Sequence, residues 1–325
     1  MRITILIDEY ASDPVAYDTV ADQVLEALLE GGHEASITTV RPDLKRLVDD
    51  LHNAQPDLVF NLCESFGPVL YGAVGVVAVL DLLGLRYTGG GPGEFYLQQD
   101  KAITKKLLAF DNIRFPDFGV FSQDSEMETG GNLRMPLFVK PLRQDASIGI
   151  EANALVSNIR DMMKRILAIH DKINDAALVE EYVDGRELYV GVVGNAQPQV
   201  LPPIEVDFSG LPEGAPRIMT GKAKWKTRSA EYKGTKTVLA DLPDELRAKV
   251  QRVALGAYRA LRVRDYGRVD MRVTDTGEIY VLEVNASCYL EKDSELAMAA
   301  RAAGMSHVQL VNEIVDLAVE RLGIR

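Results

Sequence analysis

The chain has 325 residues, of which 47% are hydrophobic and 26% are charged, and these proportions exclude a largely disordered protein. Its 36 Lys and Arg against 48 Asp and Glu give a formal net charge of −12, which argues against a nucleic acid or an anionic membrane as the main partner. Two cysteines cannot form a disulfide framework, and the apolar stretches are too short for a signal peptide or a membrane span. We therefore expect a cytoplasmic protein.

Residues 1–93 alternate short apolar runs with helical patterns. Strands are predicted at 3–7, 35–40, 57–62 and 85–88, and helices at 14–29, 44–51 and 72–83. This alternation is typical of a parallel sheet with helices on both faces. The run Gly89-Gly-Gly-Pro-Gly93 breaks the pattern, so we expect an N-terminal α/β domain that ends at residue 93.

The rest of the chain has a mixed α+β pattern, which we divide into a central unit over 94–183 and a C-terminal unit over 184–325. The central unit has predicted helices at 94–110 and 157–169, strands at 136–141 and 177–182, and a loop at 143–149. In the C-terminal unit, strands are predicted at 186–193, 198–207, 264–274 and 278–285, and helices from Pro243 onward, at 294–303 and at 306–322. The polar segment 208–237 lies between these strands, and long segments of this kind are often functional lids.

The hairpin over 264–285 carries the most informative polar residues. Because side chains on a strand alternate between faces, a turn at 276–277 places Asp270 opposite Glu283. The same register places Arg268 opposite Asn285. Two carboxylates and a carboxamide on one patch suit a hard cation such as Mg²⁺, with further ligands from substrate phosphates. The alternative is that these residues form the solvent face of an ordinary antiparallel hairpin.

Other polar residues are candidates for nucleotide binding. The apolar strand that ends at Glu180, with its connector to Glu187, could hold a nucleoside, although acids beside a turn are more often solvated. Lys140 closes another apolar strand, where a buried ammonium requires an anion. Nearby, Ser147 lies in a loop suited to meet phosphate with its N–H groups. Lysines of the 208–237 segment, such as Lys224, are by themselves typical of a solvated loop.

The sequence lacks the motifs of several other protein classes. It has no P-loop signature and no G-x-G-x-x-G after the first strand, which disfavours those two nucleotide-binding folds. Cys63, Ser65 and the four histidines have no spacing that indicates a nucleophile with its base, so we expect the histidines to have structural roles. Trp225 could cover a ligand or anchor the long polar segment.

Taken in order, these segments resemble the D-alanine–D-alanine ligase family of ATP-grasp enzymes. The matching pieces span nearly the whole chain and are 57–62, 83–89, 99–105, 138–141, 178–187, 222–225, Gly267-Arg-Val-Asp270, Val281-Leu-Glu-Val-Asn285 and 294–304. The resemblance implies an ATP-grasp fold, in which a pre-ATP-grasp α/β domain precedes two α+β subdomains that clasp ATP. It also implies a homodimer.

The resemblance further implies a role for each matching residue. Six residues would bind ATP: the phosphates would contact Lys101, Lys140 and Ser147, the adenine Glu180 and Val183, and the ribose Glu187. Lys224, in the lid, would approach the γ-phosphate. Two Mg²⁺ ions, or Mn²⁺ as an alternative, would be held by Asp270, Glu283 and Asn285. Arg268 would stabilise an acyl phosphate and a tetrahedral intermediate, and Ser294 would bind the carboxylate of the second substrate.

The positions that bind the first amino acid in the family differ here. Its first βα turn usually reads Gly-Gly-x-Ser-x-Glu, whereas residues 8–13 read Asp-Glu-Tyr-Ala-Ser-Asp. The family's His-Gly is replaced around 63–67, Ala146 stands where a serine is expected, and residues 286–289 replace a stretch with Pro-Gly. The ATP and metal positions nearly all match, so the resemblance implies a ligase with altered amino-acid specificity.

We therefore interpret the chain as an ATP-dependent carboxylate–amine ligase that acts through an acyl phosphate on small, amino-acid-like substrates and releases ADP and phosphate. One alternative is an authentic D-alanine–D-alanine ligase of peptidoglycan precursor synthesis. Another is a non-catalytic ATP-binding regulatory module. Arg268 argues against the module, because binding alone does not require an oxyanion stabiliser.

Overall fold

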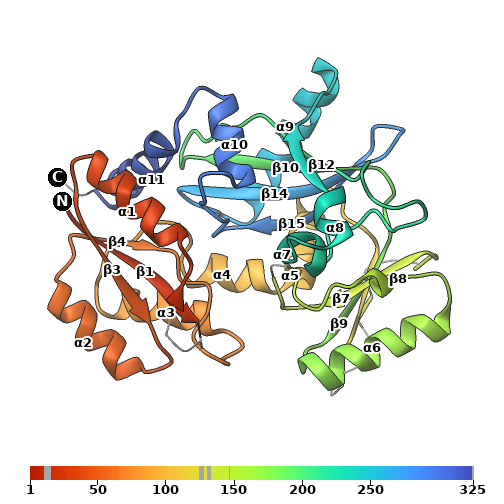
Figure 1. Cartoon of the computed structure of the whole chain (residues 1–325), viewed down its shortest axis with the longest axis horizontal. Coiled ribbons are helices and arrows are strands. Elements are labelled where there is room, and N and C mark those ends of the chain that lie inside the picture. Colours follow the sequence, from red (N-terminus) through yellow and green to blue (C-terminus); the bar gives the residue numbers. More distant parts are fainter. Residues whose placement is uncertain (11–15, 124–127, 130–132, 146, 324–325) are drawn as a thin grey trace.

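The computed structural model describes residues 1–10, 16–123, 128–129, 133–145 and 147–323. These residues form a mixed α/β architecture on three β-sheets (Figure 1). The N-terminal and central sheets lie at opposite ends of the molecule, and the C-terminal sheet extends above both (Figure 1). Within the described part of the chain, none of the helices combines the length and the apolar character needed to span a bilayer.

The N-terminal sheet is parallel, as the sequence predicts. Its strands are β1 (Arg2–Tyr10), β3 (Glu34–Val40) and β4 (Leu58–Asn61), with β1 between the other two, and the short β2 (Ala16–Tyr17) pairs antiparallel with β1. The helices are α1 (Val20–Glu30), α2 (Leu44–Ala54) and α3 (Gly72–Leu82). The buried face of α1 contains the apolar residues that predict this helix, and the left-handed Gly32 follows its end.

Two elements of this region differ from their predicted bounds. The predicted start of the first helix, at residue 14, lies outside the described residues, and the helix begins at Val20. Residues 85–88 were predicted as a strand, but they make only an isolated bridge between Val59 and Tyr87 among the described residues. The segment is too short to extend the ladder before the glycine run begins.

The central sheet is antiparallel, in the order β6 (Glu128–Thr129), β5 (Phe118–Phe121), β9 (Ala177–Glu181), β7 (Leu137–Pro141) and β8 (Leu155–Val156). The amphipathic helix α6 (Ile159–Ile173) packs its apolar face on β7 and β9, and the short η1 (Ala152–Ala154) precedes β8. The predicted helix 94–110 is two helices, α4 (Pro92–Gln99) and α5 (Lys101–Phe110). Asp100 separates them because its carboxylate caps α5 by accepting from the Ala102 and Ile103 N–H groups.

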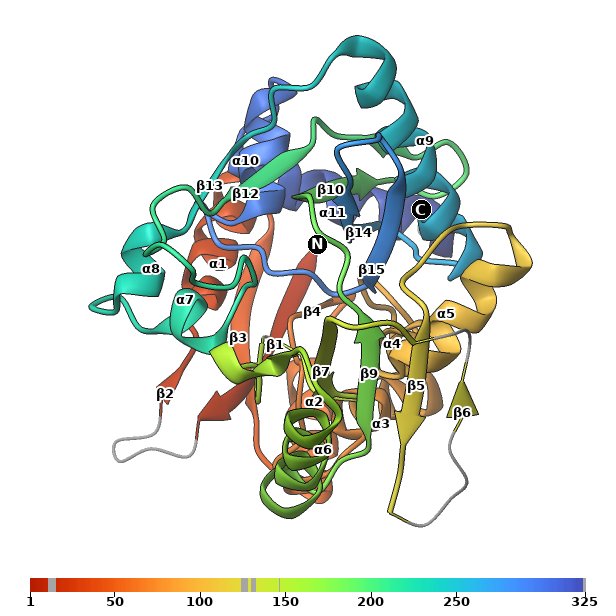
Figure 2. The same cartoon turned by 90° about the vertical axis from the view of Figure 1, so that its right-hand side faces the viewer.

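The C-terminal sheet has the order β13 (Lys236–Leu239), β12 (Ile204–Asp207), β10 (Arg186–Val193), β14 (Tyr266–Val273) and β15 (Ile279–Asn285), and β11 (Gln199–Val200) pairs with β10. Helix α9 (Asp244–Ala260) covers one face of it. Side chains of the opposite face, such as Glu187 and Arg272, border a pocket whose other wall includes Lys140 of the central sheet. The central sheet lies below the C-terminal sheet in Figure 2. The polar segment 208–237 is not a plain loop, since it contains α7 (Gly221–Trp225) and α8 (Ala230–Gly234).

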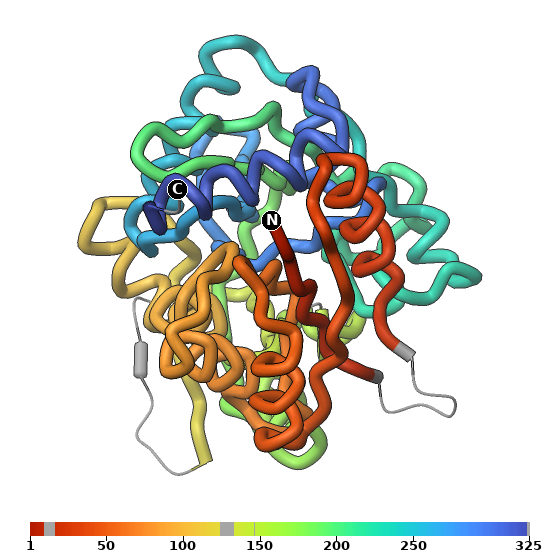
Figure 3. The backbone as a smooth tube through the Cα atoms, turned by 90° about the vertical axis from the view of Figure 1, so that its left-hand side faces the viewer, coloured from red at the N-terminus to blue at the C-terminus, as the bar shows by residue number. Residues whose placement is uncertain are grey.

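Helices α10 (Glu295–Ala302) and α11 (His307–Leu322) join the C-terminal sheet to the N-terminal sheet. α11 lies along α1 on the side of the molecule where both ends of the chain are found (Figure 3). A single apolar core includes Ile5 and Leu28 from the N-terminal region and Tyr189, Leu296 and Ile314 from the C-terminal region. The domain limits at residues 93 and 183 stay a prediction.

Asp265 links this core to the glycine run and to α11. Its fully buried carboxylate accepts hydrogen bonds from the Gly89 N–H at 2.8 Å and from Asn195 Nδ2 at 3.0 Å. Arg321 Nε and Nη2 donate to the same carboxylate at 2.9 and 2.8 Å. Three segments that are distant in sequence therefore meet at one negative charge.

We expect Asp265→Asn to lower the free energy of unfolding by about 2 kcal/mol, because Asn retains the shape but not the charge that Arg321 requires. Asp265 has a left-handed backbone (φ 64°), which Asn also tolerates, so the substitution tests the charge rather than backbone strain. Urea denaturation measures the change. Asp244→Asn, which alters an exposed carboxylate paired with Arg247, is the matched control, and an equal effect of the two would contradict this role.

Candidate active site

The β14–β15 hairpin brings four predicted polar residues together. Asp270 pairs with Glu283 and Arg268 pairs with Asn285, as the sequence predicts. The turn, however, has three residues, 275–277, between the hydrogen-bonded Thr274 and Glu278. This shifts the register by one residue, and a bulge at Leu282 restores it before Glu283 is reached. Because of the bulge, the consecutive residues Leu282 and Glu283 both line the cleft.

Arg268 contacts one of the predicted metal ligands. Its Nε and Nη2 donate to Asp270 Oδ1 and Oδ2 at 2.7 and 2.9 Å, and its Nη1 donates to Glu295 at 3.3 Å. Asn285 Nδ2 also donates to Asp270 Oδ2, at 3.2 Å. Burial opposes the charge of Arg268, but Asp270 and Glu295 outweigh it and raise the pKa of Arg268 well above its ordinary value. The guanidinium is therefore charged at any physiological pH.

The oxygen atoms at this hairpin fit Mg²⁺ bound together with a polyphosphate. Burial raises the pKa of Glu283, but Lys101, Lys140 and Arg268 outweigh it and hold this pKa below its usual range, so the carboxylate is ionised. No cluster of three or more His, Cys, Asp or Glu side chains suited to a metal occurs among the described residues. Asp270, Glu283 and Asn285 supply only part of an octahedral oxygen shell, so phosphates and water would complete it.

Glu180 lies between two buried lysines in the central sheet. Lys105 Nζ is 2.7 Å from Glu180 Oε1, and Lys140 Nζ is 2.8 Å from Glu180 Oε2. The exposed fraction of the side chain is 1% for Lys105, 7% for Lys140 and 2% for Glu180. Burial opposes ionisation of Glu180, but the two ammonium groups outweigh it and lower the pKa of Glu180 to about 2. Lys140 thus has an intramolecular anion partner at the end of its strand.

The loop after β7 contacts both α5 and the lid. Lys101 Nζ donates to Asp145 at 2.9 Å and to the Gln144 carbonyl at 2.8 Å. Ser147 has a left-handed backbone (φ 59°), and its hydroxyl donates to the Met219 carbonyl at 3.1 Å. The predicted phosphate-covering loop is therefore attached at one side to the helix that carries Lys101 and at the other to the segment that precedes α7. Ala146 of this loop and residues 11–13 of the first turn lie outside the described residues.

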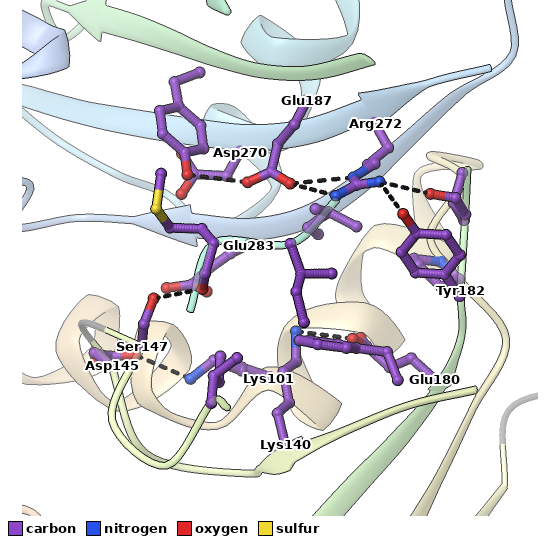
Figure 4. Close-up of a pocket in the computed structure, with 18 of the residues that line it drawn as sticks. Lys101, Lys140, Asp145, Ser147, Glu180, Tyr182, Glu187, Asp270, Arg272 and Glu283 are labelled. Carbon is purple, nitrogen blue, oxygen red and sulfur yellow. Dashed lines mark hydrogen bonds and ion pairs between the residues drawn. The ribbon is translucent and has the colours of Figure 1, made fainter. Parts of the chain in front are cut away.

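The connector between the central and C-terminal sheets is fixed by Arg272. Its Nη2 and Nε donate to Glu187 Oε2 at 2.7 and 3.1 Å, and its Nη1 donates to the Tyr182 hydroxyl at 3.0 Å and to the Val183 carbonyl at 3.2 Å. The Tyr189 hydroxyl donates to Glu187 Oε1 at 3.0 Å. Figure 4 shows Glu187, Arg272 and Tyr182 above Glu180 and Lys140, with the cleft between the two sheets.

Lys224 reaches the cleft from the lid. Thr220 caps α7 by accepting from the Ala223 N–H at 3.1 Å, which orients the helix that carries the lysine. Lys224 Nζ lies 5.4 Å from the centre of the Trp225 ring, and that ring is half exposed. Trp225 therefore borders the lid lysine and is not buried as an anchor of the segment.

The cleft between the sheets has a cavity volume of about 140 Å³. Eleven of the twelve predicted site residues line it: Lys101, Lys140, Ser147, Glu180, Val183, Glu187, Lys224, Arg268, Asp270, Glu283 and Asn285. Ser294 is not among the residues that line it in the described part of the chain; it is the N-cap of α10, next to Glu295. Ligand sites usually have about 300–1,000 Å³, so a ligand of that size would require side chains that form ion pairs in this cleft to move.

Sequence reasoning missed three charged residues that shape this cleft. Lys105 lies one helical turn after Lys101, and Arg272 lies two residues after Asp270 on the same strand face, so periodicity could have identified both. Asp145 lies in a loop, where no periodic signal marks it. These residues pair with the predicted ones and hold them in the cleft.

Comparison with a solved structure shows the fold. The D-alanine–D-alanine ligase from Bacillus anthracis, solved in complex with ATP, matches 99% of this chain and 98% of its own, with a TM-score of 0.75 at 23% identity. This match confirms the predicted ATP-grasp fold. An α/β region with a parallel sheet is followed by two α+β regions, each with an antiparallel sheet.

Sequence comparisons identify the family. The family described as D-ala D-ala ligase C-terminus matches residues 107–316. The chain is 34% identical over 310 residues to the uncharacterised protein y4sG of Sinorhizobium fredii, covering 93% of this chain and 88% of that protein. It is 34% identical over 302 residues to the D-alanine–D-alanine ligase of Desulforudis audaxviator, covering 92% of each. The chain belongs to the D-alanine–D-alanine ligase-like family and is an ATP-dependent ligase that forms carbon–nitrogen bonds. The alternative of a non-catalytic module has no support.

Proposed function

We propose that this ligase joins the carboxylate of one amino-acid-like substrate to the amine of another through an acyl phosphate. The γ-phosphoryl group of ATP is transferred to a carboxylate oxygen, and ADP leaves. The amine nitrogen then attacks the acyl carbon, the carbon–oxygen bond to phosphate breaks, and the nitrogen loses a proton. The observation that carries the proposal is the juxtaposition of Arg268 with the oxygen ligands Asp270, Glu283 and Asn285 on one hairpin.

The nucleotide lies between the two sheets in this proposal. Lys101, Lys140 and Lys224 reach the same cleft from three elements and neutralise the phosphates, with Ser147 in the covering loop. Binding competes with the contacts of Lys101 to Asp145 and of Lys140 to Glu180. Since Glu180 is occupied by lysines, its backbone and that of Val183 are better placed than its carboxylate to meet adenine. Glu187, held by Arg272, accepts from the ribose hydroxyls.

The metal assignment follows from the donor set. Asp270, Glu283 and Asn285 hold Mg²⁺, with two ions in the complete site and Mn²⁺ as an alternative. When bound, the metal supplies charge neutralisation at the β- and γ-phosphates. Arg268 must exchange part of its contact with Asp270 for the acyl phosphate, and it then stabilises the oxyanion of the tetrahedral intermediate.

The second substrate and the exclusion of water complete this proposal. Ser294 and the N-terminal end of α10 bind the carboxylate of the second substrate, because helix N-termini favour anions. The contact of Glu295 with Arg268 places this helix end close to the proposed reacting centre. Acyl phosphates hydrolyse readily, so water must be excluded. Closure of the segment that carries Lys224 over the cleft performs this task.

The first substrate is where this chain departs from the family pattern. Asp8 ends the apolar part of β1, and its carboxylate accepts from the Glu64 N–H at 3.0 Å and from the Ser65 hydroxyl at 2.7 Å. Two segments that differ from the family, 8–13 and 63–67, are thus bonded to each other at the carboxyl edge of a parallel sheet, where ligands bind in such folds. Burial and the carboxylate of Asp8 raise the pKa of Glu64 to about 8, and the nearby charges of Lys224 and Arg268 oppose this shift. We place the first-substrate site beside Glu64.

The experiment is a phosphate-release screen with ATP, Mg²⁺ and pairs of D- and L-amino acids, followed by mass spectrometry of the product. We expect D-alanine alone to be at least ten times slower than the best pair, because the segments near Asp8 and Glu64 are altered. Equal rates would instead favour an authentic D-alanine–D-alanine ligase. If no pair in a broad panel stimulates phosphate release, the ligase proposal is contradicted. The homodimer and the cytoplasmic location stay predictions.

A further inference from the structure

A second cavity lies away from the catalytic cleft, between α6 and the segment 148–156. Its volume is about 450 Å³, which falls within the range of about 300–1,000 Å³ that is usual for small-molecule sites. Of the described residues, none lines both this cavity and the cleft. Residues of α6 and β8 line it, and these two elements lie at the outer end of the central sheet (Figure 1).

The cavity contains a buried and weakly neutralised arginine. Arg165 is 7% exposed, and its Nη2 donates to the Gly149 carbonyl. The carboxylate nearest to it, on Glu151, is 4.0 Å from Nη1 and belongs to a side chain that is 67% exposed. Arg165 Nε has no hydrogen-bond partner among the described residues. A buried guanidinium normally has a close carboxylate, because an unpaired buried charge is costly.

Arg272 shows what such pairing looks like in the same protein. It is as well buried as Arg165, but Glu187 lies 2.7 Å from its Nη2. Burial opposes the charge of both arginines. Glu187 outweighs burial and raises the pKa of Arg272, whereas Glu151 does not, and the pKa of Arg165 is lowered. Among the described residues, Arg165 therefore lacks a close negative partner of the kind that Arg272 has in Glu187.

The walls of the cavity define the class of ligand. Lys164 and Lys172 of α6 also line the cavity, and Lys172 lies two turns after Arg165 on the same face. With Asp161 and Glu151, the described charged residues at the cavity leave an excess of positive charge. The remaining wall is apolar and includes Leu155, Val156, Ala168 and Ile173. A guanidinium beside an apolar wall suits a molecule with an anionic head and an apolar body.

We propose that this cavity binds a small organic anion, with its carboxylate or phosphate on Arg165 and its apolar body against Leu155 and Val156. The neighbours of Ile150 in the chain, Gly149 and Glu151, line this cavity. The Ile150 carbonyl itself accepts from the Gly221 N–H at 2.9 Å, at the start of α7. The site is nevertheless separate from the ATP cleft, and its occupancy does not depend on turnover.

Calorimetric titration of the full-length protein tests the proposal, with a non-hydrolysable ATP analogue at saturation to fill the cleft. The probes are phenyl phosphate and benzoate, which combine an anionic group with an apolar ring. Inorganic phosphate, which has only the anionic group, and benzyl alcohol, which has the ring without a charge, are the control ligands. We expect one saturable site for at least one of the two organic anions, and at least tenfold weaker binding of inorganic phosphate and of benzyl alcohol. Equal binding of inorganic phosphate would overturn the organic-anion assignment.

The variants locate the binding. Arg165→Met should weaken the organic anion at least tenfold, whereas Arg160→Met, at an exposed arginine of the same helix, should leave its affinity within twofold. If Arg165→Met does not fold, Ala168→Phe fills the cavity without removing a charge and should also abolish binding. Unaltered affinity in the folded Arg165 or Ala168 variant, or no saturable binding to the wild type, would overturn the proposal.

Discussion

Glu283→Gln and Asp270→Asn are each expected to fold normally and to lose at least about 100-fold of the ATP-dependent phosphate release. Both substitutions keep the shape of the side chain but remove one negative charge from the oxygen set on the hairpin. Mg²⁺ binds carboxylate oxygens more strongly than amide oxygens, so the charge of the ATP phosphates would be poorly neutralised. Initial rates over a wide range of Mg²⁺ concentration, with circular dichroism as a check on folding, measure the effect.

The two variants differ in what else they change. Asp270 is also the bidentate partner of Arg268, so Asp270→Asn alters the guanidinium as well as the metal site. Glu295→Gln is the matched control, because it removes a different carboxylate contact of Arg268, at 3.3 Å, without touching a proposed ligand. We expect the control to retain a normal Mg²⁺ dependence. Normal turnover of Glu283→Gln at low Mg²⁺ would show that the metal assignment is wrong.

The hairpin shows how far local rules predict a site. Period-two alternation correctly predicts that Asp270 faces Glu283 and that Arg268 faces Asn285. The turn used to derive this register is wrong by one residue, and the bulge at Leu282 compensates for the error. The length of a turn depends on local backbone geometry, whereas the position of a bulge depends on the packing on both faces of the strand. The alternation of polar and apolar residues alone predicts neither of them.

The charge partners were less predictable than the site residues themselves. Lys140 was correctly expected to need an anion, but that anion is Glu180, which is 40 residues later in the chain and two strands away in chain order. Their pairing depends on β9 lying beside β7 in the central sheet. This order of strands is a property of the tertiary structure and cannot be predicted from composition or residue spacing. The prediction of one long helix at 94–110 is wrong for a local reason. Asp favours a capping position over a helix interior, so the chain forms two helices on either side of Asp100.

Glu180→Gln should destabilise the unliganded protein by about 3–5 kcal/mol at pH 7, the usual cost of breaking a buried ion pair from one side. The amide leaves Lys105 and Lys140 buried without the carboxylate that pairs directly with both of them. Glu181→Gln is the matched control on the same strand, because Glu181 pairs with Arg134, whose side chain is 80% exposed. We expect the control to change stability by less than about 1 kcal/mol.

The pH dependence separates this charge effect from a packing effect. The folded pKa of Glu180 is about 2, below its ordinary value of 4.5, so the carboxylate contributes stability that is fully present above pH 4.5 and is lost as the pH falls through 2. The difference between wild type and Glu180→Gln should therefore shrink in acid. Burial also lowers the pKa of Lys105, and Glu180 opposes that shift, so the variant should recover stability at alkaline pH as Lys105 becomes neutral. Urea denaturation from acid to alkaline pH measures both trends, and a difference that stays constant with pH would mean that Glu180 acts through packing.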